Sequence, residues 1–234
     1  MNDILVISDN VEILNQFRRI VADKNLSDTY KFTYACSPGN HLCNTTVDVI
    51  LDAPKIIENQ YMVLSLHCKQ VFPKELTSQC RCVNVHPGYN PYNRGMFPHV
   101  FSIVNGLPCG ATIHEMDSHI DHGQVICQKQ VQVQSYDTSL TLYEKIVCAE
   151  IELLNVYIED ILRNTYVTYT VDKGNINYKK DFDALCNLNL QHTGTLWNHI
   201  KLLRALSHGE YKNAYFIDDH GRKIYIKLQV DEPS

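Results

Sequence analysis

Residues 61–86 read YMVLSLHCKQVFPKELTSQCRCVNVH, and this stretch decides the predicted fold. Tyr61 to Leu66 and Cys80 to His86 are short apolar runs with the length of buried strands, and Pro73 to Thr77 between them suits a helical turn. Strand, helix and strand in this order form a unit whose two strands run parallel in one sheet. We therefore predict an α/β protein with a mostly parallel sheet covered by helices on both faces.

The same alternation extends in both directions from this unit. Toward the N-terminus we expect strands at Asp3 to Ser8, Tyr30 to Cys36 and Val47 to Leu51, with helices at Val11 to Lys24 and Pro54 to Asn59. Toward the C-terminus we expect a helix at Pro98 to Val104, strands at Gly110 to Met116 and Val125 to Val133, and a long helix at Ser139 to Arg163. These elements make one sizeable domain, predicted to span residues 1–170.

The C-terminal part does not continue the alternation of strands and helices. A charged connector, Lys179-Lys180-Asp181, precedes a helix at Thr195 to Leu206 and a hairpin at Ala214 to Val230. A lone helix and hairpin cannot hold a core in water, so this part must dock on its own domain or on another subunit. We predict a small helix and β-hairpin subdomain at residues 171–234 and a symmetric homodimer formed through the hairpin.

Composition narrows the function classes. The chain has 234 residues, 44% of them hydrophobic and 20% charged, which indicates a folded globular protein. Its net charge of −5 disfavours a general nucleic-acid binder. No apolar run approaches the ~20 residues of a membrane span, and nine cysteines without a Cys-x-x-Cys pair indicate a reducing compartment. We expect a cytoplasmic protein with no nucleic-acid or membrane partner.

The predicted strand end Val83-Asn84-Val85-His86-Pro87-Gly88 is the first candidate for chemistry. Neither a Gly-x-Gly-x-x-Gly fingerprint nor a phosphate-binding loop of the Walker type is present, so the fold by itself indicates neither NAD nor ATP. Asn84 and His86 share one face of the strand, at the carboxyl end where open α/β sheets bind ligands. An imidazole can move a proton and an amide can stabilise an oxyanion. The alternative is that both residues only close the strand.

A second candidate is the stretch from Gly110 to Gly123, which holds several histidines and carboxylates. One interpretation is a metal-dependent, deacetylase-like hydrolase that uses the His114–His122 cluster, because these are suitable ligand types. Another is that one carboxylate orients His86, as the third group of a triad does. A solvated acidic turn is the plain structural alternative.

Several segments together resemble a known family. They are Asn84-Val85-His86-Pro87, Asn93-Arg94-Gly95, Gly110-Ala111-Thr112-Ile113-His114 and Asp121-His122-Gly123. Their order and spacing resemble the formyltransferases that use 10-formyltetrahydrofolate, over about residues 1–165. The resemblance implies a Rossmann-like formyltransferase domain, 10-formyltetrahydrofolate as co-substrate, no metal, and a catalytic trio of Asn84, His86 and Asp121.

The details resemble one branch of that family. His86-Pro87-Gly88-Tyr89-Asn90-Pro91 departs from the His-Pro-Ser-Leu-Leu-Pro of the purine-synthesis and methionyl-tRNA members, and the tail from Lys179 to Ile226 has no counterpart in them. Both features resemble the bacterial sugar N-formyltransferases, closest to those acting on dTDP-4-amino-4,6-dideoxyglucose for surface glycans. Formyl transfer to another amine, or a catalytically inert folate or sugar-nucleotide binding module, are the alternatives.

The resemblance also implies ligand contacts. The folate would lie against a loop containing Gln70, Val71 and Phe72 and, on its far side, against Asp117 and His119. Candidate contacts for the nucleotide-linked aminosugar are Lys74 and Arg94 for the diphosphate and Tyr89, Asn90 and Tyr92 for the sugar. For Trp197 we favour packing in the core over stacking on the base.

Overall fold

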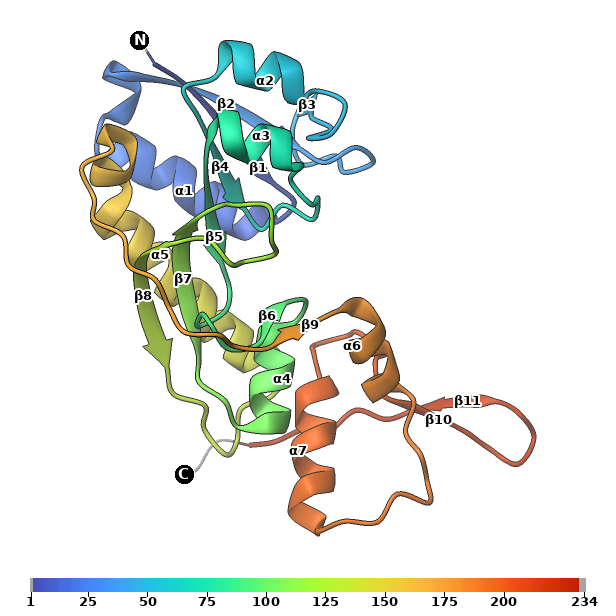
Figure 1. Cartoon of the computed structure of the whole chain (residues 1–234). Coiled ribbons are helices and arrows are strands. Elements are labelled where there is room, and N and C mark those ends of the chain that lie inside the picture. The colour runs from blue at the N-terminus through green and yellow to red at the C-terminus, as the bar shows by residue number, and fades with distance from the viewer. Residues whose placement is uncertain (1, 232–234) are drawn as a thin grey trace.

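A seven-stranded sheet forms the centre of the protein, as seen in a computed structural model that describes residues 2–231 (Figure 1). The strands are β1 (Asn2–Ser8), β2 (Tyr30–Cys36), β3 (Thr45–Thr46), β4 (Met62–Leu66), β5 (Arg81–His86), β7 (Cys109–Glu115) and β8 (Val125–Val131). Their order across the sheet is β3-β2-β1-β4-β5-β7-β8. Only β7 departs from the parallel pattern, because it runs antiparallel to both β5 and β8. The predicted α/β fold with a mostly parallel sheet is confirmed.

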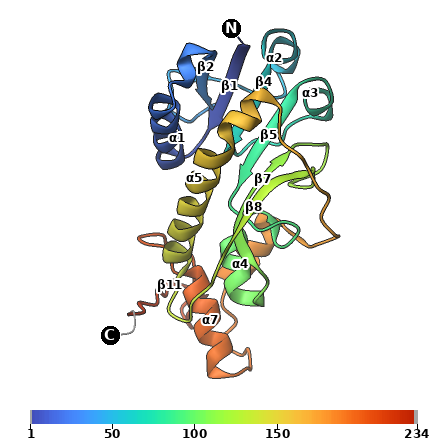
Figure 2. The same cartoon turned by 90° about the vertical axis from the view of Figure 1, so that its left-hand side faces the viewer.

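Helices cover both faces of this sheet (Figure 2). One face carries α1 (Val11–Asp23) and α5 (Ser139–Arg163), and the other carries α2 (Ala53–Asn59) and α3 (Lys74–Gln79). Helix α1 begins where Asn10 Oδ1 accepts the backbone N–H groups of Glu12 and Ile13. A short 3₁₀ helix, η1 (Leu26–Asp28), follows it. Two apolar clusters, one on each face, bury the nearly all-apolar strands β1 and β4.

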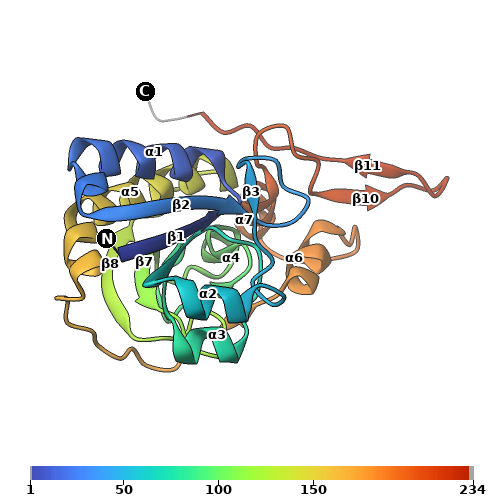
Figure 3. The same cartoon turned by 90° about the horizontal axis from the view of Figure 1, so that it is seen from above.

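The C-terminal elements lie beyond one end of the sheet. They are α6 (Lys179–Cys186), α7 (Leu196–Leu206) and the antiparallel hairpin of β10 (Tyr215–Ile217) and β11 (Lys223–Tyr225), which projects from the body (Figures 1 and 3). Helix α7 packs against α4 (Pro98–Asn105) with Ala205 and Leu206 fully buried. The short strands β6 (Arg94–Gly95) and β9 (Ile176–Asn177) pair between the two parts. This part therefore docks on its own chain, while a domain boundary at residue 170 stays a prediction.

Two predicted segments are corrected by the structure. Val47 to Leu51 is not a strand, because Asp48 Oδ1 accepts the N–H groups of Ile50 and Leu51 and folds the segment into a turn. The connector at Lys179 is instead the first turn of α6, where the Asp181 carboxylate accepts the N–H of Tyr178 and caps the helix. In residues 2–231 no helix is long and apolar enough to cross a membrane.

Candidate active site

The carboxyl end of β5 brings the predicted trio together. Asn84 pairs in register with His114 of the antiparallel strand β7, and Asp121 follows β7 in a loop, at a left-handed φ of 47°. Asn84 Nδ2 lies 3.2 Å from Asp121 Oδ1 and 3.3 Å from His114 Nε2. His86 Nδ1 lies 3.5 Å from Asp121 Oδ2. Asp121 is therefore the centre on which Asn84, His86 and His114 converge.

His86 is held as a neutral base. Its side chain is 4% exposed, and its Nε2 is buried without a hydrogen-bond partner among residues 2–231. Burial lowers the pKa of His86 to about 4, although the Asp121 carboxylate acts in the opposite direction. With Asp121 beside Nδ1, the ring hydrogen belongs on Nδ1 and the lone pair on Nε2. This ring can therefore accept a proton at Nε2.

Asp121 is held as a carboxylate. Burial alone raises the pKa of Asp121, but the neighbouring imidazoles of His86 and His114 favour the carboxylate form. The Gly95 N–H, which donates to Oδ2 over 3.0 Å, favours it too, so the pKa lies well below its usual range. Asn90 supports the same loop, since its Nδ2 donates to the Asp121 carbonyl over 2.9 Å. The trio thus contains an ionised carboxylate, a neutral imidazole and an amide.

A cavity of about 830 Å³ opens over the trio. All five residues predicted to contact the folate line it: Gln70, Val71, Phe72, Asp117 and His119. The Gln70 side chain is already engaged, because its Oε1 accepts the N–H of Val49 and its Nε2 donates to the carbonyl of Val47. The loops before β5 and after β7 therefore form two walls of one cavity, as the folate prediction requires.

The five residues predicted to contact the sugar nucleotide do not line this cavity. They are Lys74, Tyr89, Asn90, Tyr92 and Arg94. Lys74 is exposed on α3, and Asn90 is 1% exposed with its amide used to support Asp121. Trp197 also lies outside the cavity and is 47% exposed, so our expectation that it packs in the core is wrong. Arg204 lies over its ring, 5.3 Å from the centroid.

The histidine and carboxylate cluster divides into two groups. Asp117, His119 and His122 bring ligand atoms within 4.8 Å of one another, with both histidine side chains more than half exposed. His114 is not part of this group, because it is buried and its Nδ1 donates to the carbonyl of Glu115 over 2.7 Å. The cluster proposed for a metal-dependent hydrolase is therefore not one site, because its buried histidine, His114, contacts Asn84 and Asp121 of the trio instead.

Sequence reasoning missed a second group of polar residues at the cavity. His67 follows β4 at a left-handed φ of 58°, and its Nε2 lies 2.8 Å from Oε1 of Glu150, which is fully buried. His67 Nδ1 lies 3.2 Å from the hydroxyl of Tyr143. The available signal was Glu150 itself, a carboxylate on the apolar stripe of α5 between Ile146 and Leu154.

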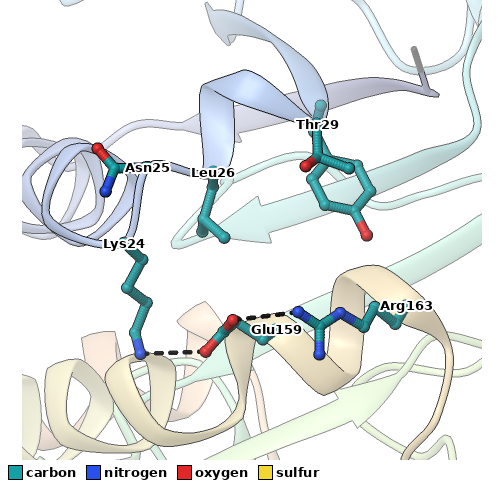
Figure 4. A pocket seen from close by; sticks show the side chains of 7 residues that line it. Lys24, Asn25, Leu26, Thr29, Glu159 and Arg163 are labelled. Carbon is teal, nitrogen blue, oxygen red and sulfur yellow. Dashed lines mark hydrogen bonds and ion pairs between the residues drawn. The ribbon is translucent and has the colours of Figure 1, made fainter.

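A much smaller pocket lies between α1 and α5, away from this site (Figure 4). In it Glu159 of α5 pairs with Lys24 at the end of α1, over 3.4 Å, and with Arg163, over 3.3 Å. These partly exposed ion pairs join the two helices that cover the same face of the sheet. We assign this pocket a structural role only.

Comparison with known proteins identifies the family. Residues 48–158 match the formyl transferase family model, and residues 181–232 match the model described as the N-formyltransferase dimerization C-terminal domain. The chain is 39% identical to the dTDP-4-amino-4,6-dideoxyglucose formyltransferase of Mycobacterium bovis over 229 residues, which make up 97% of this chain and 96% of that protein. This chain belongs to the sugar N-formyltransferase family.

Solved sugar N-formyltransferases share the whole fold. A sugar N-formyltransferase from Shewanella is 42% identical with a TM-score of 0.95, and all of both chains is covered. A 4-N formyltransferase from Francisella tularensis is 38% identical with a TM-score of 0.94, with 99% of both chains covered. The predicted resemblance is confirmed, and the interpretation as a hydrolase is set aside in favour of a sugar N-formyltransferase.

Proposed function

We propose that this sugar N-formyltransferase transfers a formyl group from 10-formyltetrahydrofolate to the amino group of dTDP-4-amino-4,6-dideoxyglucose. The observation that carries the proposal is His86, whose Nδ1 lies 3.5 Å from Asp121 while its buried Nε2 has no hydrogen-bond partner among residues 2–231; His86, Asn84 and Asp121 all line the cavity. The choice of sugar rests on the substrate named for the Mycobacterium relative, which is similar over 97% of this chain.

His86 handles the protons of the reaction. The sugar amine attacks as a neutral group, so its ammonium form first loses one proton to solvent. As the new C–N bond forms, His86 Nε2 accepts a second proton from the attacking nitrogen. Asp121, beside Nδ1, stabilises the resulting imidazolium. His86 then returns this proton to the departing nitrogen as the old C–N bond breaks, so the ring ends neutral.

Asn84 stabilises the charge that develops on the formyl oxygen. Its Nδ2 carries two hydrogens, and its bonds to Asp121 and His114, at 3.2 and 3.3 Å, are long ones. An oxygen that becomes negatively charged in the transition state competes well for one of these hydrogens. The same two bonds hold the amide in a fixed orientation before the reaction begins.

The cavity residues fit 10-formyltetrahydrofolate, which supplies the formyl carbon. Gln70 ties the loop before β5 to the turn at Val47, which keeps that wall in place. On the opposite wall, the Asp117 carboxylate accepts the N–H of His119 over 2.8 Å and closes the loop that leads to Asp121. We propose that these two walls hold the folate and exclude water from His86.

The test is a transfer assay with the purified protein. Incubated with 10-formyltetrahydrofolate and dTDP-4-amino-4,6-dideoxyglucose, the protein should yield a sugar nucleotide heavier by one formyl group, and the 3-amino isomer should react poorly. His86→Asn should abolish transfer, while His122→Asn, a change at an exposed histidine, should retain it. A wild-type protein that transfers formyl to neither sugar would refute the proposal.

We further propose that two copies assemble through the C-terminal part, residues 171–234. The dimerization model matches residues 181–232, and apolar side chains on this part remain exposed in the single chain. Leu196 is 75% exposed on α7, and Ile224 and Tyr225 of the hairpin are 37% and 46% exposed. Packing one hairpin against another would bury these side chains.

A further inference from the structure

The cavity has few cations for a substrate that carries a diphosphate. Among its lining residues Lys69 is the only lysine or arginine, and it is exposed. The predicted diphosphate contacts Lys74 and Arg94 do not line the cavity. A doubly charged group therefore needs other donors if it is to bind near the catalytic trio.

Such donors gather in one lobe of the cavity. We call it the donor lobe and define it by six residues that line it: Asn10, His67, His99, Ser139, Tyr143 and His208. The N-terminal turns of α4 and α5 both open here, since His99 and Ser139 belong to them. Neither turn contains an acidic residue. No side chain within residues 2–231 caps α4, whereas the Thr138 hydroxyl accepts the N–H of Thr141 and caps α5, so α4 is the more open of the two helix ends. The N-terminus of a helix attracts anions through its free N–H groups and its dipole.

His99 is an independent sign that a ligand belongs in this lobe. Its side chain is buried, 6% exposed, and its Nδ1 has no hydrogen-bond partner in the described part of the chain. The rings of Tyr143 and His208 lie at centroid distances of 5.3 and 5.8 Å. Burial lowers the pKa of His99 to about 3, so the ring is neutral and has one N–H to donate. A buried ring nitrogen without a partner is costly unless a ligand satisfies it.

The hydrogen bonds around Tyr143 also favour donation into the cavity. Asn10 Oδ1 caps α1, so its amide must present Nδ2, which donates to the Tyr143 hydroxyl oxygen over 2.6 Å. With its oxygen accepting from Asn10, Tyr143 keeps its own hydrogen for His67 Nδ1 or for a ligand. Ser139 Oγ lies 2.9 Å from His208 Nδ1 and adds a second hydroxyl at the same place.

The carboxylates near the lobe are already engaged. Both oxygens of Glu150 lie within 2.9 Å of His67 Nε2, and Asp9 accepts hydrogen bonds from Ser37, Asn40 and the N–H of Lys69. Glu12 and Glu144 do not line the cavity. These hydrogen bonds offset part of the repulsion that an anion in the donor lobe would meet from the two carboxylates.

We propose that the donor lobe binds the diphosphate of the nucleotide-linked sugar. This proposal rests on the proposed function, because it assumes that a nucleotide-linked sugar is the substrate. The sheet supports this placement, because Leu66 of β4 pairs with Val85 of β5, so His67 and His86 lie at the same end of two neighbouring parallel strands and both line the cavity. A sugar nucleotide in this cavity would have its amine at His86 and its diphosphate at the N-terminal turns of α4 and α5, where His99 and Ser139 line the same cavity.

The test measures binding of pyrophosphate and of dTDP by calorimetry. His99→Leu should weaken both by roughly tenfold or more, Tyr143→Phe by roughly threefold or more, and His99→Asn should recover part of the loss. Lys74→Met and Arg94→Met test the competing assignment, and Lys55→Met, at an exposed residue of α2, is the neutral control. Melting temperatures of all variants report folding.

Three outcomes decide the proposal. Larger losses for Lys74→Met or Arg94→Met than for His99→Leu and Tyr143→Phe would overturn it. The proposal would also be overturned if His99→Leu weakened the binding of tetrahydrofolate but not of dTDP, and left the binding of a folate without its glutamate tail unchanged. The lobe would then bind the carboxylates of that tail. If wild type binds dTDP through His99 yet transfers no formyl group to the aminosugar, the donor lobe is supported as a diphosphate site and the proposed function is refuted.

Discussion

His86 and His99 are both buried as neutral rings, and this makes stability depend on pH. Burial lowers their pKa values to about 4 and about 3, whereas an unfolded histidine takes up a proton near 6.5. Between pH 6.5 and 4 the unfolded chain therefore binds more protons than the folded one, and stability falls as pH falls. Each ring should cost about 1.4 kcal/mol per pH unit in that window.

Urea unfolding at pH 7, 6 and 5 checks this expectation. The free energy of unfolding should decline below pH 6.5, and His99→Leu should decline less steeply because one buried ring is gone. Parallel pH profiles for wild type and His99→Leu would contradict the neutral state assigned to His99.

Asn84 separates a catalytic role from a structural one. If its amide stabilises the oxyanion, Asn84→Ala should lower kcat on the order of 10²–10³-fold with little change in sugar-nucleotide affinity. If the amide serves mainly to hold Asp121 and His114, the variant should lose melting temperature and keep most of its turnover while folded. Turnover, affinity and melting temperature of one purified variant distinguish the two outcomes.

At the scale of elements, the position of the His86 ring at the end of β5 requires a glycine, Gly88, two residues further on. A Cβ at Gly88 would lie 2.3 Å from His86 Nε2, so Gly88→Ala should displace the ring that acts as base. A misplacement of about 1 Å can cost roughly 10²-fold in rate, and we expect a loss of kcat of that order.

The control for Gly88→Ala is Gly194→Ala, where the nearest atom to the new Cβ is His199 Nε2 at 3.5 Å. That variant should behave as wild type in steady-state kinetics. Normal turnover of Gly88→Ala would mean that His86 does not need its observed position.

Helix and strand ends also explain why the site lies where it does. Strand β7 runs antiparallel to β5, which brings His114 opposite Asn84 and lets the following loop return Asp121 to the trio. The N-terminal turns of α4 and α5 reach the same cavity from the C-terminal side of the molecule. The cavity is thus built from ends of elements, where side chains are not committed to packing.

At the scale of the whole molecule, the exposed hairpin predicts assembly. Ile224→Asp places a charge on the surface proposed to pair, so the variant should be monomeric in light scattering where wild type is dimeric. Val167→Asp is the matched control, because Val167 is an apolar residue 84% exposed outside the C-terminal part, and it should leave the dimer intact. A wild-type protein that is monomeric at micromolar concentration would refute the dimer.

The sequence by itself determined the strand and helix alternation around residues 61–86, the end of β5 and the trio of Asn84, His86 and Asp121 as neighbours. These depend on local signals: apolar runs, helix caps and a motif whose spacing resembles a family. Local signals failed at Val47 to Leu51, where the Asp48 carboxylate outweighed the strand propensity of the valines and isoleucine.

Only the tertiary structure decided what surrounds the trio. His67 and Glu150 are 83 residues apart in the chain, yet His67 Nε2 lies 2.8 Å from the fully buried Glu150 carboxylate behind the cavity wall. Lys74 and Arg94 have the right charge for a diphosphate but lie outside the cavity, while the neutral His99 is one of the residues that line it. Burial and long-range packing set these contacts, and neither is encoded in the few residues on either side of a motif.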